Sequence, residues 1–150
     1  MYCGSKDHMM KAIEHFIHLG ATDWTFDTSR LEGTVRGIPA ESHAHMAFNY
    51  QLLPGIEYEL LYYEGDTRWD PPVDRGAHFI SHLSYHVNDI AVEIDRLVPF
   101  FGHPVQMFET HDHTNDQIKD KKRFREVIFN TRLLFGHDIK LIQRIPWGDG

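Results

Sequence analysis

The sequence predicts an α+β fold of two tandem βαβββ modules, with helices outside a curved mixed sheet. Residues 7–20 and 89–102 both begin with Asp, a favourable helix N-cap, and both end with Gly after apolar residues at helical spacing. Their offset of 82 residues also matches residues 24–28 with 106–110, and an offset of 81 matches 59–61 with 140–142. A near-constant offset indicates an internal repeat.

Each predicted helix is combined with strands. In the first module, strands are expected over residues 23–36, 41–53 and 56–63, and Pro54-Gly55 is a turn signal between the last two. The same offset places a further strand at the chain start, where only part of it fits, so the first strand is expected to be truncated. In the second module, strands are expected over 79–87, 104–111, 123–132 and 137–145.

The strand expected over residues 79–87 alternates in character. Because successive side chains of a strand point to opposite faces, Leu83, Tyr85 and Val87 form an apolar face that should meet the helices. His82 and His86 lie on the opposite face, with Ser84 between them. In the strands over 56–63 and 137–145, Glu59 and Lys140 lie on faces that carry most of the charged groups. These faces predict a polar concave pocket.

Composition limits the class of protein. The 150 residues, 41% of them hydrophobic, suit a single domain, with a first module at 1–65, a linker at 66–77 and a second module at 78–147. The net charge of −7 argues against nucleic-acid binding, and no apolar run of about 18 residues predicts a membrane helix. A single cysteine, Cys3, cannot form an internal disulfide, so a cytoplasmic protein is expected.

This architecture resembles the vicinal oxygen chelate superfamily, which includes glyoxalase I, extradiol dioxygenases and fosfomycin-resistance proteins. The resemblance rests on the modules, on His82 in Ile-Ser-His-Leu-Ser and on Glu59 in Pro-Gly-Ile-Glu-Tyr. It implies a single glyoxalase-like domain in which strands curl around a divalent metal. The implied ligand positions include Glu59 and His82, whereas Lys140 stands where a carboxylate is usual.

A carboxylate and an imidazole together suit Zn²⁺, Fe²⁺, Mn²⁺ or Ni²⁺. Glu59 is expected as a metal ligand or general base, His82 as a ligand, and Lys140 as an electrostatic stabiliser or an anchor for an anionic substrate. A third ligand is needed, and His45 is the first choice, with His86, otherwise expected to contact substrate, the second. The alternative is a polar pair without metal, and for His45 a strand with exposed histidines.

The roles of two further groups of residues remain open. Arg123, within a basic run at residues 119–125, is expected to contact substrate unless the run is a solvated loop. The His111-Asp112-His113 segment reads as a metal-binding lip, a lid or a polar turn.

The leading functional hypothesis is a small-molecule metalloenzyme with isomerase, lyase or dioxygenase chemistry. The competing hypothesis is a metal-free protein that binds or sequesters a small ligand in the same cleft. Because the truncated first strand leaves a sheet edge open, a homodimer is expected.

Overall fold

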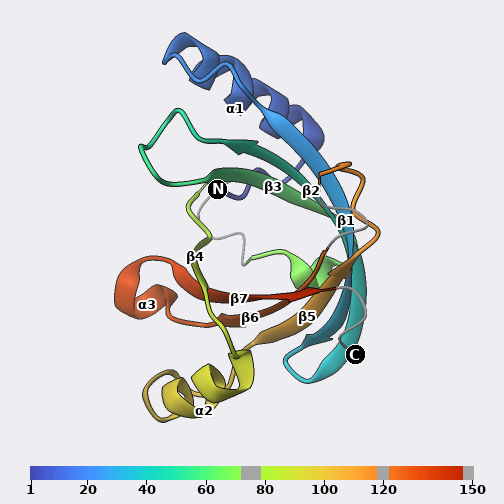
Figure 1. The fold of residues 1–150 in the computed structure, drawn as a ribbon, viewed down its shortest axis with the longest axis vertical. Coiled ribbons are helices and arrows are strands. Elements are labelled where there is room, and N and C mark those ends of the chain that lie inside the picture. The colour runs from blue at the N-terminus through green and yellow to red at the C-terminus, as the bar shows by residue number, and fades with distance from the viewer. Residues whose placement is uncertain (72–78, 118–121, 147–150) are drawn as a thin grey trace.

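One curled, mixed sheet forms the body of the protein (Figure 1). The structure is a computed structural model that describes residues 1–71, 79–117 and 122–146. Within these residues the sheet has seven strands in the order β3-β2-β1-β5-β6-β7-β4, and only β4 and β7 pair in parallel. The strands are β1 (Thr25–Val35), β2 (Ile38–Asn49), β3 (Tyr58–Gly65), β4 (His82–His86), β5 (Gln106–His111), β6 (Lys122–Phe129) and β7 (Asp138–Pro146).

The two predicted helices are present. Helix α2 (Ile90–Phe101) begins as predicted, because the Asp89 carboxylate accepts hydrogen bonds from two backbone N–H groups of its first turn, and Gly102 ends it at φ +75°. Helix α1 (Lys6–His18) begins slightly earlier than predicted, because Ser5 rather than Asp7 is the N-cap.

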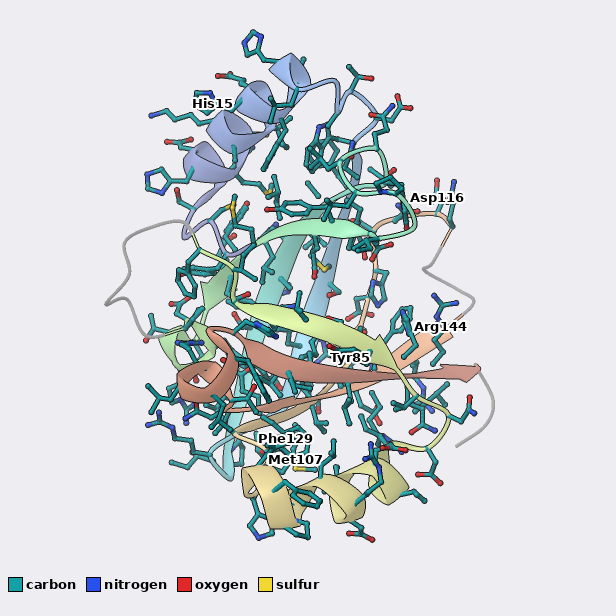
Figure 2. The ribbon with its side chains drawn as sticks, turned by 90° about the vertical axis from the view of Figure 1, so that its left-hand side faces the viewer. His15, Tyr85, Met107, Asp116, Phe129 and Arg144 are labelled. Atoms are coloured by element: carbon teal, nitrogen blue, oxygen red, sulfur yellow. The ribbon has the colours of Figure 1, made fainter. Side chains whose placement is uncertain are left out.

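Both helices pack on the outer face of the sheet. Met9 and Ile13 of α1 contact Ala47 of β2 and Leu60 of β3. At the other end of the sheet, Ile90 of α2 belongs to a cluster that also holds Phe129, the last residue of β6, whose ring contacts that of Phe101 on α2 (Figure 2). The inner, concave face has an apolar cluster of its own: Leu31, Val35, Ala40, Ala44, Trp69, Phe108 and Ile128.

Three details differ from the sequence prediction. Within the predicted linker, Thr67–Trp69 form a short 3-10 helix (η1), and Trp69 is buried in the inner cluster; residues 72–77 of that linker lie outside the described residues. A short helix, α3 (Arg132–Phe135), joins β6 to β7. Leu83 and Tyr85 do not meet a helix and are 45% and 51% exposed, because α2 packs on β6 and β7 instead. Of the predicted apolar face, only Val87, just beyond the end of β4, packs against the cluster of α2, β6 and β7.

The two edge strands of the sheet approach each other. The Tyr2 backbone pairs in parallel with Leu61 of β3 and antiparallel with Phe79, three residues before β4. The Tyr2 N–H donates to the Phe79 carbonyl at 2.9 Å, and the Cys3 N–H donates to the Leu61 carbonyl at 2.8 Å. Side chains on the inner faces of β3 and β4 are therefore brought together, although these strands stand at opposite ends of the strand order.

Candidate functional site

A carboxylate and an imidazole meet where the two sheet edges approach. Glu59 on β3 and His82 on β4 lie with Oε2 and Nε2 3.5 Å apart, and their side chains are 19% and 7% exposed. The structure thus brings together the two residues that the sequence assigned to one site. Strand alternation explains their common direction, because Glu59 shares its face with Tyr63 of the inner cluster.

A buried ion pair lies next to these two residues. Lys140 Nζ on β7 is 2.9 Å from Glu126 Oε2 on β6, and each side chain is only 9% exposed. Glu126 was not predicted from the sequence. The only signal was its alternation with Phe124 and Ile128, which assigns it to the face of β6 that also carries Ile128 of the inner cluster. We call Glu59, His82, Glu126 and Lys140 the inner polar cluster.

The charges of the inner polar cluster depend on one another. Burial alone would raise the pKa of Glu59, but the nearby Lys140 ammonium and the hydrogen bond with His82 lower it to about 2. Burial and Lys140 together lower the pKa of His82 to about 4, against the effect of Glu59. Burial would also lower the pKa of Lys140, but Glu126 and Glu59 raise it. At neutral pH Glu59 is therefore a carboxylate, Lys140 an ammonium and His82 a neutral imidazole.

The second nitrogen of His82 also has a partner. Nδ1 lies 3.1 Å from the Ser81 hydroxyl, which can donate to it when Nε2 carries the proton that Glu59 accepts. Glu59 therefore favours one tautomer of the neutral ring.

The inner polar cluster is a poor fit for a resident divalent ion. Glu59 and His82 are suitable donors, but the Lys140 ammonium lies close enough to lower the pKa of Glu59 and is paired with Glu126. A metal ion placed among these carboxylates would repel the ammonium. Within residues 1–71, 79–117 and 122–146, no three His, Cys, Asp or Glu side chains are grouped to hold a metal.

The histidine chosen first as a third ligand lies elsewhere. His45 is on the outer face of β2, where its ring stacks on Tyr62 at 4.6 Å and contacts Thr28 and Glu64. The structure does not bring His45 to Glu59 and His82, because the sheet separates them. His86 is on the same face of β4 as His82 but is exposed at the far end of the strand.

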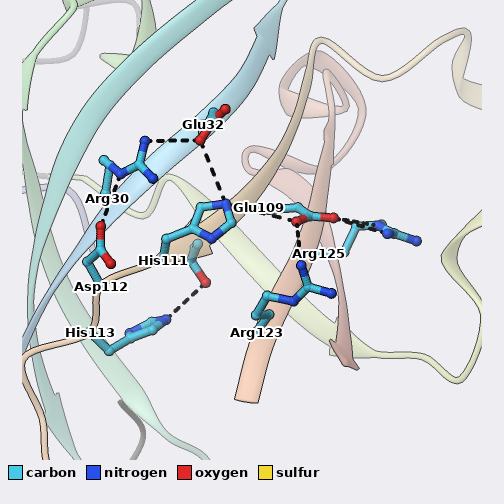
Figure 3. Close-up of polar contacts among 9 residues, drawn as sticks. Arg30, Glu32, Glu109, His111, Asp112, His113, Arg123 and Arg125 are labelled. Atoms are coloured by element: carbon cyan, nitrogen blue, oxygen red, sulfur yellow. Dashed lines mark hydrogen bonds and ion pairs between the residues drawn. The ribbon is translucent and has the colours of Figure 1, made fainter. Parts of the chain in front are cut away.

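Arg123 is also separated from the inner polar cluster by the sheet. It lies on the outer face of β6, 3.9 Å from Glu109, which also pairs with Arg125 at 3.0 Å (Figure 3). The structure therefore does not place Arg123 at the cleft, where it was expected to contact substrate. Lys119 and Lys121 of the same basic run lie outside the described residues.

The histidine segment after β5 divides between the two faces. His111 lies on the outer face, with Nε2 3.9 Å from both Glu32 and Glu109 (Figure 3). His113 turns inward, where Nδ1 is 2.6 Å from the buried Asp27 carboxylate and Nε2 is 3.1 Å from the Thr110 hydroxyl. The contact of His113 with Asp27 therefore holds this segment against β1.

A cavity of about 400 Å³ opens beside His82. Its volume lies in the range of small-molecule sites. Apolar groups and charged groups share its wall, and His82 and Ser81 connect it to the inner polar cluster. The main lining side chains are Val35, Tyr63, Arg68, Trp69, His82, Val105, Gln106, Ile128, Arg132 and Asp138.

No family model matches this chain, and no curated protein matches it. In the described part of the chain, neither the length nor the apolar character of any helix suffices to cross a membrane.

Proposed function

We propose that the chain has the tandem βαβββ architecture of the vicinal oxygen chelate superfamily. The strand order supports this, because it runs β1-β2-β3 in one direction from the centre and β5-β6-β7-β4 in the other. The parallel bridge of Tyr2 to Leu61 of β3 stands where the parallel pair of β4 and β7 stands in the second half. On this reading, residues 1–3 occupy the position of the first strand of the first module.

The function that the geometry supports best is the binding of a small molecule in the cavity beside His82, without a resident metal. The observation that carries this proposal is the position of Lys140. Its ammonium pairs with Glu126 and lowers the pKa of Glu59, so it supplies the positive charge that a metal would otherwise provide among these carboxylates. The neutral His82 ring, held by Glu59, borders the cavity as a fixed polar group.

Metal content tests this proposal directly. Protein purified without a histidine tag should contain less than about a tenth of an equivalent of Zn, Fe, Mn or Ni, and should take up none on titration at a pH of about 7.5. Lys140→Glu should bind Zn²⁺ more tightly than the parent, because it replaces the ammonium with a third ligand. Arg125→Glu, on the outer face, should not. Stoichiometric metal in the parent, lost in His82→Ala, would refute the metal-free proposal.

Ligand binding in the cavity needs a separate test. A mixture of small aromatic and aliphatic fragments is screened by saturation-transfer NMR against the parent and against Val105→Phe, which narrows the cavity. Fragments should bind the parent and lose most of their signal in the variant. Fragment binding that Val105→Phe leaves unchanged would place it elsewhere and contradict the proposal.

The second candidate is a metal-dependent isomerase, lyase or dioxygenase that uses Glu59 and His82 as ligands. The 3.5 Å approach of these two side chains is the observation that favours it. The metal analysis above decides between the two candidates, because only this one requires a bound ion in the parent.

A further inference from the structure

The geometry points to a small ligand with an apolar body and a single carboxylate, which Arg36 binds at the rim of the cavity beside His82. This inference rests on the proposed binding function and names the chemical class that the cavity would select.

Arg36 belongs to the cavity wall, at the hairpin that joins β1 to β2. Its backbone N–H donates to the Val105 carbonyl at 2.7 Å, and the Val105 N–H donates to the Ile128 carbonyl at 2.8 Å. All three residues line the cavity. The backbone of Arg36 is therefore fixed against two other residues of the wall.

The Arg36 side chain is a free cation. It is exposed, and no hydrogen bond or ion pair holds its guanidinium within residues 1–71, 79–117 and 122–146. The other two arginines of the wall have partners: Arg68 pairs with Asp66, and Arg132 pairs with Asp138 at 2.6 Å. Arg36 can therefore bind a carboxylate through its planar guanidinium without giving up an existing contact.

The charges of the wall favour one negative charge on the ligand. His82 is neutral at neutral pH, and basic side chains outnumber acidic ones by one in the described lining: Arg36, Arg68, Arg132, Asp70 and Asp138. Asp70 accepts a hydrogen bond from the Tyr2 hydroxyl, and burial raises its pKa. An anion at the rim therefore meets one basic group in excess, although the whole chain carries a net charge of −7.

The conformation of the hairpin turn supports a role for this side chain. Arg36 and Gly37 form the turn with positive φ values of 51° and 77°. Two-residue turns of this kind favour Asn before Gly, because Asn adopts the left-handed conformation more easily than most residues. An arginine in this conformation is strained, and strained residues are frequent at ligand-binding sites.

Accessible apolar surface lies close to Arg36. Ile38, two residues further on, is 56% exposed and lines the cavity together with Val35 and Val105. One small molecule can therefore pack its apolar body on these side chains and present its carboxylate to Arg36.

Four probes of similar size test the inference: benzoate, benzamide, toluene and phenyl phosphate. Each is titrated against the whole chain by saturation-transfer NMR at about 20 mM NaCl, where charges are little screened. Benzoate should bind at least about fivefold more tightly than benzamide or toluene, since it alone adds a charge-assisted hydrogen bond to the same apolar contacts. Phenyl phosphate should bind less tightly than benzoate, because its second negative charge would remain unbalanced. At about 0.5 M NaCl most of the preference for benzoate should disappear.

Arg36→Asn isolates the contribution of the side chain. Asparagine suits the left-handed backbone, so the variant should fold, but it lacks the charge. Benzoate should then bind only as tightly as benzamide, while benzamide and toluene keep their affinities within about twofold. Arg125→Asn removes the same charge from the outer face, so it is the matched control and should leave the preference for benzoate unchanged.

A preference for benzoate that survives in Arg36→Asn would overturn the inference, and so would tighter binding of phenyl phosphate than of benzoate. Equal binding of benzoate, benzamide and toluene, all lost in Val105→Phe, would overturn it as well, while leaving the proposed cavity function intact. If none of the probes binds and the fragment screen also fails, the inference and the proposed function fall together.

Discussion

At the scale of single residues, Lys140 is the buried cation of the inner polar cluster. It is held by Glu126 and influenced by Glu59, in a position where the superfamily resemblance implies a carboxylate. A buried ion pair adds little net stability, but removing one partner leaves the other charge unpaired, which is strongly destabilising. Lys140 therefore contributes to folding as well as to the charge of the site.

Lys140→Met should lower the free energy of unfolding by about 3–5 kcal/mol, because Glu126 and Glu59 would lose their counter-charge. Arg125→Met is the control, since the Arg125–Glu109 pair is partly exposed, with side chains 47% and 28% exposed, and should contribute at most about 1 kcal/mol. Urea denaturation at neutral pH measures both. Equal effects of the two substitutions would mean that Lys140 is not the counter-ion of the inner polar cluster.

The lowered pKa of His82 predicts how the stability of the protein depends on pH. The unfolded chain protonates this histidine near its ordinary pKa of 6.5, whereas the folded protein does so only near 4. Between these values the unfolded state binds more protons, so stability should fall as the pH drops from about 6.5 towards 4, by on the order of 3 kcal/mol in total. The lowered pKa of Glu59 adds a loss that begins lower, below about 4.5.

His82→Gln should remove most of the loss between pH 6.5 and 4. His15→Gln should not, because His15 is exposed and points away from α1 into solvent (Figure 2). Urea denaturation at several pH values compares the three proteins. A parent and a His82→Gln variant with the same slope would show that His82 is not held neutral in the folded state.

At the scale of elements, the junction of β1 and β5 joins the two halves of the sheet. Gly33 of β1 pairs with Phe108 of β5, and a Cβ at Gly33 would lie 2.0 Å from the Met107 carbonyl oxygen. Such a close approach between backbones leaves no room for a side chain. The absence of a side chain at this position is thus what lets β1 and β5 pair at the centre of the sheet.

Gly33→Ala should lower the free energy of unfolding by about 2 kcal/mol or more, because β1 and β5 must separate. Gly37→Ala should cost only about 1 kcal/mol, since nothing lies within 4 Å of its Cβ and only its left-handed backbone, φ +77°, is strained. Thermal and urea denaturation measure the two changes. A smaller loss of stability at Gly33 than at Gly37 would show that β1 and β5 can separate at Gly33 without destabilising the protein.

At the scale of the whole molecule, β4 is the strand most available to a partner. Among the described residues it pairs only with β7, its outward residues Leu83 and Tyr85 are about half exposed, and it carries no Lys, Glu or Pro. Edge strands of monomers usually have such protecting residues. The expected homodimer would therefore use this edge rather than the start of the chain, where residues 1–3 cover part of β3.

Sedimentation equilibrium at micromolar concentration should find a dimer, and the double substitution Leu83→Lys and Tyr85→Lys should give a monomer. Phe100→Lys, at an exposed position on α2, is the control and should leave the dimer intact. A monomeric parent, or a dimer that survives both changes on β4, would contradict an interface at this edge.

The sequence by itself determined the local elements and which residues share a face. Helix periodicity and the Asp89 and Gly102 caps predict α2 closely, and strand alternation groups His82 with His86. These features depend on neighbours in the chain, which the sequence contains. The internal offset of 81 to 82 residues, together with the family resemblance, also pointed to Glu59, His82 and Lys140 as parts of one site.

Only the tertiary structure decided which face is concave and what meets there. Alternation assigns His45 and Arg123 each to one side of a strand, but the side that becomes the inner wall depends on how the sheet curls. The structure places both outside. The pairing of Glu126 with Lys140 and of Asp138 with Arg132 likewise depends on the tertiary structure. A buried charge is stabilised by whichever opposite charge the packing brings close to it.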